Sequence, residues 1–228
     1  MEQRRDSATA YIILADGFET IEALTPLDVL RRCGVEVTTI SLNKTRAVRS
    51  SHGVTVEADA TMEEFMHNCN CCASGTGTST NTSIAGTSSS AGSSTTASSA
   101  NTTAGSCLRQ ALILPGGYPG YKNLCESAEV GALITQFHKE GKLLCAICGA
   151  PTALKANQIC RGAAITCHTS VKEELSDYYS ILSSAVVKYM NIITGMGAGR
   201  SLDFAFAIAE ALTSKEKVEE IKAKMEII

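Results

Sequence analysis

The segment CAICGAP at 145–151 has the residue types and spacing of a nucleophile elbow. An apolar run at 142–147 predicts a buried strand, and a helix is expected to begin at Gly149, directly after Cys148. In such an elbow, small neighbours let the strand and the helix approach closely, which leaves the nucleophile exposed on a strained turn. Because a helix N-terminus stabilises negative charge, we expect a lowered pKa for the Cys148 thiol. The alternative interpretation is a structural cysteine at a strand–helix junction.

Other motifs in the chain are weaker. Cys145 and Cys148 form a CxxC, but a redox pair sits on a loop and a helix start, whereas Cys145 is expected inside the strand. Three cysteines cluster at 69–72 without a second CxxC or a paired histidine to complete a zinc site. The glycine-rich stretch 195–199 lacks the GxGxxG spacing of a dinucleotide fold and predicts a tight turn. We therefore expect no cofactor and no metal.

Other strand ends supply groups that could act with a thiol. Glu19 and Glu22 follow the first predicted strand, and a carboxyl beside a cysteine can share its proton as a general acid or base. His168 follows a later strand and could pair with the thiol, while the glycine turn ending at Gly117 could direct N–H groups at an oxyanion. Singly, Glu22 is typical of a helix-start carboxylate and His168 of a loop histidine. Their joint placement at strand ends favours a functional site.

Strand and helix patterns alternate along the chain. Short β-branched or apolar runs predict strands at 9–14, 35–42, 48–51, 54–57, 110–114, 142–147, 164–167 and 191–194. Helices are expected at 25–33, 61–68, 127–140, 149–156, 201–212 and 215–228, the first with Thr25 as N-cap and Pro26 in its first turn. The alternation predicts an α/β fold with a mostly parallel sheet covered on both faces. Sites in such folds lie beyond the carboxyl ends of the strands.

One low-complexity stretch interrupts this pattern. Of the 34 residues at 73–106, 31 are Ser, Thr, Ala or Gly. Such a composition buries too little apolar surface to offset its ordering entropy, so we expect a disordered insertion at about 69–107. An interdomain linker is the alternative, but the residues before it make only half a sheet. We therefore interpret 1–228 as a single interrupted domain.

Bulk properties exclude several classes of protein. A net charge of −3 and a pI near 5.8 argue against a dedicated nucleic-acid surface. No apolar run approaches the ~18 residues of a membrane span, and MEQRRDSATA lacks the apolar segment of a signal peptide. The ten cysteines form no disulfide framework, which favours a reduced, cytoplasmic location.

Six segments of the chain form a recognisable set: ADGFETIEALTPLDVLRRCG, ALILPGG, NLCESAEV, LLCAICGAPTAL, ITCH and GRSLDFAFAIAEAL. Together they closely resemble the ThiJ/PfpI family, and most of all its branch of the parkinsonism-associated protein deglycase. The resemblance covers nearly the whole chain apart from the N-terminal few residues and the Ser/Thr-rich stretch.

The resemblance implies a flavodoxin-like three-layer sandwich, usually a homodimer. It implies Cys148 as nucleophile, Glu22 as its acidic partner, His168 as the histidine, and the backbone N–H groups of Gly117 and Gly149 as the oxyanion hole. Two positions depart from the family pattern. His52 stands where a basic residue near the pocket is usual, and Glu57 stands where a cysteine is often found.

Family members are described as glutathione-independent glyoxalases, as deglycases of early glycation adducts and as oxidation-sensing chaperones. The leading hypothesis is accordingly a cofactor-independent enzyme acting on methylglyoxal-type α-oxoaldehydes or their protein adducts in carbonyl and oxidative stress defence. A non-enzymatic redox-sensing chaperone using Cys148 is the alternative. Peptidase or amidotransferase chemistry is disfavoured, because the His-x-Glu pair of His138 and Glu140 precedes Cys148 instead of following it.

Overall fold

The computed structural model describes residues 8–68 and 110–227. The predicted insertion at about 69–107 lies outside these residues. Strands from both described segments join in one sheet, because β1 (Thr9–Leu14) pairs in parallel with β6 (Gln110–Leu114). The two segments therefore build one structural unit.

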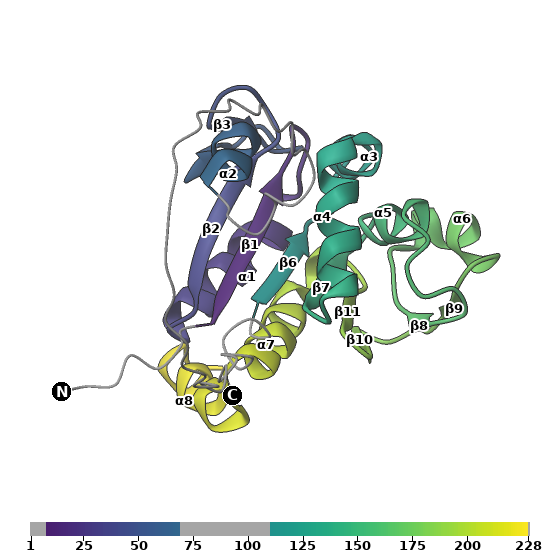
Figure 1. Ribbon diagram of the computed structural model, residues 1–228. Helices are drawn as coiled ribbons and strands as arrows, with labels where there is room; N and C mark the ends of the chain where they lie inside the picture. The colour runs from purple at the N-terminus through teal and green to yellow at the C-terminus, as the bar shows by residue number, and fades with distance from the viewer. Residues whose placement is uncertain (1–7, 69–109, 228) are drawn as a thin grey trace, which may run out of the picture.

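A seven-stranded sheet forms the centre of the described fold, in the order β10-β11-β7-β6-β1-β2-β5 (Figure 1). All its neighbouring strands are parallel except β10, which runs antiparallel to β11. Its remaining strands are β2 (Glu36–Ser41), β5 (Ala60–Thr61), β7 (Leu143–Ile147), β10 (Val186–Tyr189) and β11 (Ile192–Gly195). Two small sheets lie outside it: the antiparallel pair β3 (Ala47–Arg49) and β4 (Thr55–Glu57), and the parallel pair β8 (Ala164–Ile165) and β9 (Ser180–Ile181).

Helices cover both faces of the sheet, which makes the predicted three-layer sandwich. One face packs against α1 (Thr20–Arg32), α7 (Ser201–Leu212) and α8 (Lys215–Lys224). The other carries α2 (Met62–Asn68), α3 (Gly120–Glu126), α4 (Ala128–Lys139), α5 (Pro151–Ala156) and α6 (Lys172–Ser176). Two short 3₁₀ turns, η1 (Thr169–Val171) and η2 (Ala198–Arg200), precede α6 and α7.

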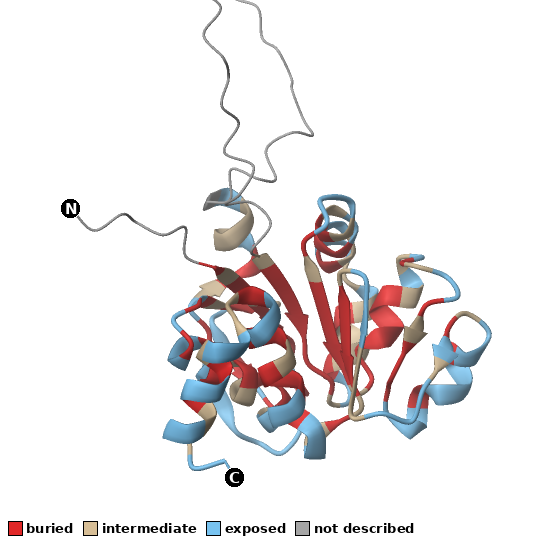
Figure 2. Cartoon of the chain, turned by 90° about the horizontal axis from the view of Figure 1, so that it is seen from below, coloured by how far each residue is buried: buried red, intermediate tan, exposed pale blue. Residues whose placement is uncertain are grey.

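The sheet is the core of the molecule. Along β1, Ile12 and Leu14 pack toward α1 and α7 while Ile13 packs toward α4, and all three are fully buried. A strand buried on both faces must be apolar throughout, which explains the β-branched and apolar runs. Figure 2 shows the buried residues concentrated in the central strands and the exposed residues on the outer helix surfaces.

The prediction for α1 is wrong at its N-terminus. The helix begins at Thr20, with Glu19 as N-cap, and Pro26 lies in its interior. Its buried residues, Glu22, Ala23, Pro26, Val29 and Leu30, recur with helical periodicity and form one stripe. Burying this stripe outweighs the ~3 kcal/mol that an interior proline costs. As a result Glu22 lies in the first turn of a helix that starts five residues earlier than expected.

Other elements differ in smaller ways. The segment at 164–167 forms only a short strand in a side sheet, and α3, α6, β5, β9 and β10 are elements that the sequence pattern did not predict. The last helix ends at Lys224, four residues before the predicted end. The predicted helix at 127–140 is confirmed, including Ser127 as N-cap, whose side chain accepts a hydrogen bond from the Val130 N–H.

Candidate active site

Cys148 sits on a sharp turn between β7 and α5. It has a positive φ of 65°, a conformation that costs a non-glycine residue energy and is typical of functional turns. Its N–H donates to the Gly195 carbonyl over 3.0 Å, and its own carbonyl accepts the His168 N–H at 2.9 Å. At Gly149 a Cβ would lie 2.7 Å from the Tyr121 ring, so only glycine fits without a shift. The predicted elbow is confirmed.

Glu22 faces this turn from α1. Its side chain is fully buried, the Gly116 N–H donates to its Oε2 over 2.9 Å, and its Oε1 has no hydrogen-bond partner among the described residues. A Cβ built on Gly116 would lie 2.6 Å from the Glu22 Oε2 and 3.0 Å from the Cys148 Sγ. The Glu22 carboxyl group and the Cys148 sulfur therefore both lie against Gly116, where only a residue without a side chain leaves room for them.

Burial controls the charge of this pair. It raises the pKa of Glu22 to about 7, against the contact with Cys148 and the Gly116 hydrogen bond, which both lower it. Burial also raises the pKa of the Cys148 thiol to about 12, aided by the charge and hydrogen bond of Glu22 and opposed by the N–H groups of Gly149 and Gly117. The predicted lowering of the thiol pKa is thus wrong, because desolvation is the largest influence on it. A six-residue helix cannot outweigh desolvation and an adjacent carboxylate.

Two backbone N–H groups approach the sulfur, those of Gly149 and Gly117. Gly117 has a φ of 91°, and a Cβ there would lie 2.3 Å from the Glu19 nitrogen and 2.4 Å from the Gly17 carbonyl oxygen. This turn therefore requires glycine and fixes the direction of its N–H. Both N–H groups therefore act on the Cys148 sulfur, and each lowers its pKa.

His168 lies beside the cysteine without a side-chain hydrogen bond to it. Its Nδ1 accepts the Ser170 N–H at 3.2 Å and lies 2.8 Å from the Ser170 Oγ. Because Nδ1 acts as an acceptor, the neutral imidazole carries its proton on Nε2. The Cδ2 edge of the ring would lie 3.4 Å from a Cβ on Gly197, which places it against the turn after β11.

One cavity of about 600 Å³ beyond the carboxyl ends of the central strands is lined by Cys148, Glu22, Gly117 and His168. Its lining also includes Met196 and Arg200, which sequence reasoning did not select. The only sequence signal for them is the glycine-rich turn that follows β11. The structure thus brings Cys148, Glu22 and His168 together, as predicted.

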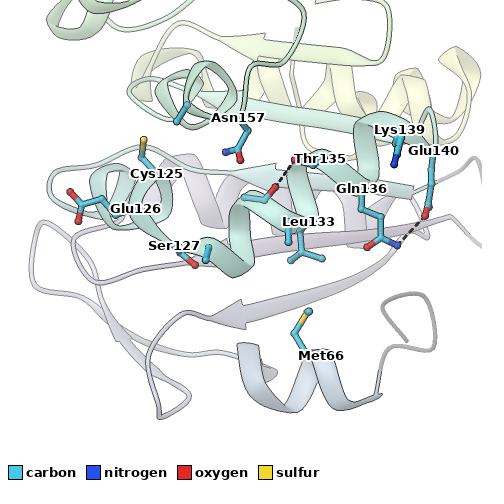
Figure 3. Close-up of a pocket in the computed structure, with 14 residues that line it drawn as sticks. Met66, Cys125, Glu126, Ser127, Leu133, Thr135, Gln136, Lys139, Glu140 and Asn157 are labelled. Carbon is cyan, nitrogen blue, oxygen red and sulfur yellow. Dashed lines mark hydrogen bonds between the residues drawn. The ribbon is translucent and has the colours of Figure 1, made fainter. Parts of the chain in front are cut away.

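A larger cavity of about 810 Å³ runs along α4 between α2, α3 and α5 (Figure 3). Its one thiol, Cys125, lies with its Sγ 3.8 Å from the Thr152 carbonyl. The dashed contact between Gln136 and Glu140 in Figure 3 is an ordinary helix-surface hydrogen bond of 2.9 Å. Reactive groups converge in the smaller cavity, which is therefore the candidate active site.

Within residues 8–68 and 110–227, no three His, Cys, Asp or Glu side chains are arranged to hold a metal ion. In the same ranges no helix is long and apolar enough to cross a membrane. The cysteine cluster at 69–72 lies outside them.

Fold and site together define an α/β sandwich with a cysteine on an elbow beside a buried glutamate. The chain belongs to the DJ-1/PfpI family, whose model matches residues 8–211. It is 33% identical to protein dj-1beta of Drosophila melanogaster over 94% of this chain and 95% of that protein. It is 30% identical to the Parkinson disease protein 7 homolog of Danio rerio, over 95% of each chain. The family resemblance of the sequence is confirmed.

Solved structures agree with the flavodoxin-like fold. The crystal structure of Drosophila melanogaster DJ-1beta has a TM-score of 0.77 at 30% identity and covers 97% of this chain and 99% of that one. A relative from Caenorhabditis elegans, the glutathione-independent glyoxalase DJR-1.2, is 38% identical over 107 residues, which are 46% of this chain and 56% of that protein.

Proposed function

We propose that the protein is a cofactor-independent glyoxalase that acts on α-oxoaldehydes such as methylglyoxal, with Cys148 as nucleophile. The observation that carries this proposal is the approach of the Cys148 sulfur and the Glu22 carboxyl across Gly116, inside a cavity. The glyoxalase name of the Caenorhabditis elegans relative supports the same chemistry.

The mechanism begins with proton transfer inside the pair. The ionised Glu22 carboxylate takes the thiol proton while the Cys148 sulfur attacks the aldehyde carbon, and the proton passes from Glu22 to the new oxyanion to give a hemithioacetal. Glu22 then removes the proton from that carbon and returns it to the neighbouring carbonyl carbon through an enediol, while the hydroxyl proton of the hemithioacetal moves to the former ketone oxygen. The product is a thioester, and water hydrolyses it to lactate and free thiol.

The environment of Glu22 suits this relay. A group with a pKa of about 7 is ionised often enough to accept a proton and protonated often enough to return it near neutral pH. The N–H groups of Gly117 and Gly149 donate toward the reacting centre and favour negative charge there. His168 offers its Nε2 proton at the cavity wall, a second donor for substrate oxygen.

The same chemistry extends to early adducts of α-oxoaldehydes on protein side chains, and with it to carbonyl and oxidative stress defence. A homodimer and a cytoplasmic location belong to this proposal as well.

A redox-sensing chaperone is the second candidate. The observation that favours it is the set of hydrogen-bond donors around Cys148, because Gly117, Gly149 and a protonated Glu22 would also stabilise an oxidised sulfur anion. Peptidase or amidotransferase chemistry finds no support, since the His138 Nε2 faces the Cys160 sulfur at 3.7 Å instead of Cys148.

The deciding experiment measures D- and L-lactate formed from methylglyoxal. Wild type should form lactate, and Cys148→Ser should reduce the rate to background. Cys125→Ser and Cys160→Ser, which alter partly buried thiols outside the cavity, should retain it. Wild-type turnover no higher than that of Cys148→Ser would exclude the glyoxalase and leave the redox function to be tested by peroxide oxidation of Cys148.

A further inference from the structure

The cavity at Cys148 has an uneven distribution of charge. Four ionisable side chains besides the cysteine line it: Glu19, Glu22, His168 and Arg200. Glu22 is largely neutral below a pH of about 7 because burial raises its pKa. The Glu19 Oε2 already has two polar neighbours, the Ser51 Oγ at 3.3 Å and the His52 Nδ1 at 3.4 Å. Arg200 is the one Arg or Lys among the described residues that line the cavity.

Arg200 is free to bind a further anion. Its one ion pair in the described chain joins its Nη1 to the Asp203 Oδ2 over 3.7 Å, longer than a hydrogen bond, and both side chains are more than half exposed. Exposed pairs of this kind contribute little, so a ligand carboxylate can replace Asp203 at small cost. A planar guanidinium with several N–H donors matches a carboxylate or a phosphate better than an ammonium group does.

The backbone around Arg200 supports the same charge preference. Arg200 ends η2 and caps α7, a helix of 12 residues, and its own N–H donates to the Gly197 carbonyl over 2.8 Å. The positive end of α7 and the guanidinium thus lie on the same wall of the cavity.

We infer that Arg200 is a substrate-binding residue that holds an anionic group on the substituent of the α-oxo substrate. The substrate class is then α-oxoaldehydes whose far end carries a carboxylate or phosphate, with the aldehyde carbon at Cys148 and the anion at Arg200. The catalytic part of this inference rests on the proposed function. The binding part rests only on the cavity and its charge.

The binding part is tested with two alkylating agents of similar size, anionic iodoacetate and neutral iodoacetamide. The ratio of their rates at Cys148, measured by peptide mapping, is compared in wild type and in Arg200→Gln. Arg32→Gln is the matched control, because Arg32 also pairs with an aspartate on its own helix, Asp28, but lies away from the cavity. Arg200→Gln should lower the iodoacetate-to-iodoacetamide ratio about fivefold, as expected for loss of one nearby charge. An unchanged ratio, or an equal fall in Arg32→Gln, overturns the inference.

The substrate class is tested with phenylglyoxal and 4-carboxyphenylglyoxal. Arg200→Gln should reduce kcat/KM for the carboxylated substrate, mainly through KM, about fivefold more than for phenylglyoxal. Equal losses for the two substrates would overturn the assigned class. If neither substrate is turned over by wild type while the alkylation ratio still falls in Arg200→Gln, the proposed function fails and the anion site stands.

Discussion

Replacing Glu22 by Gln should make the stability of the protein less dependent on pH. The glutamine oxygen can still accept the Gly116 N–H that donates to Oε2 in wild type, so the local hydrogen bond survives. What the variant loses is the capacity to ionise. Because the wild-type side chain is fully buried, ionisation in the folded state is the unfavourable event.

The size of the effect follows from the pKa of Glu22, which burial raises from 4.5 to about 7. Between these pH values the folded protein keeps a proton that the unfolded chain has lost, so the free energy of unfolding falls as pH rises. A shift of this size corresponds to about 3 kcal/mol, present in full below pH ~4.5 and lost above pH ~7. Relative to wild type, Glu22→Gln should therefore gain about 2.5 kcal/mol between about pH 5 and about pH 8, because a small part of the effect is already lost at pH 5.

Urea unfolding of wild type and Glu22→Gln at these two pH values measures the difference directly, provided that the m-values agree. Glu36→Gln, which removes an exposed carboxylate on β2, controls for the loss of a charge as such. A Glu22→Gln difference that stays constant with pH would refute the assignment of a buried, proton-holding carboxyl. Lactate formation by the same variant should fall at every pH, because an amide cannot relay a proton.

Two further predictions test the surroundings of the site. Gly117→Ala should lower the free energy of unfolding by more than about 2 kcal/mol, because the φ of Gly117 is positive and a Cβ there would overlap the backbone of residues 17–19. A variant as stable as wild type in a urea titration would contradict this. Cys160, 3.7 Å from the His138 Nε2, should react faster with iodoacetamide than Cys125, and His138→Phe should reduce the difference. A difference in rate by peptide mapping that is unchanged in His138→Phe would show that the imidazole does not affect the thiol.

The main features of the site could be predicted because they follow from local pattern and sheet geometry. Parallel strands end at one edge of the sheet, so residues placed just after different strands converge there. Glu22 and Gly116, which are 94 positions apart in the sequence, meet in this way. The elbow at Cys148 needed only an apolar strand, small neighbours and a proline at the helix start. Both inferences use information within a few residues of each position.

The start of α1 and the charge state of Cys148 could not be predicted in the same way. A proline at position 26 locally favours a helix start, and only the packing of α1 against α7 and the sheet overrides it. The thiol pKa depends on desolvation and on the carboxyl of Glu22, both of which are set by tertiary contacts. Arg200 was missed for a related reason, since a single arginine after a glycine turn has no pattern of its own.

Three unfavourable features meet at one point of the structure. Cys148 has a positive φ, Glu22 is buried with an oxygen that lacks a partner among the described residues, and burial raises the pKa of both groups. Stability alone would be better served by a glycine at the turn and an apolar side chain in place of the carboxyl. The fold nevertheless keeps these three unfavourable features together, at the place where a nucleophile and a proton carrier are needed. This concentration of strain and perturbed pKa values is the physical argument that the cavity at Cys148 is a site of chemistry.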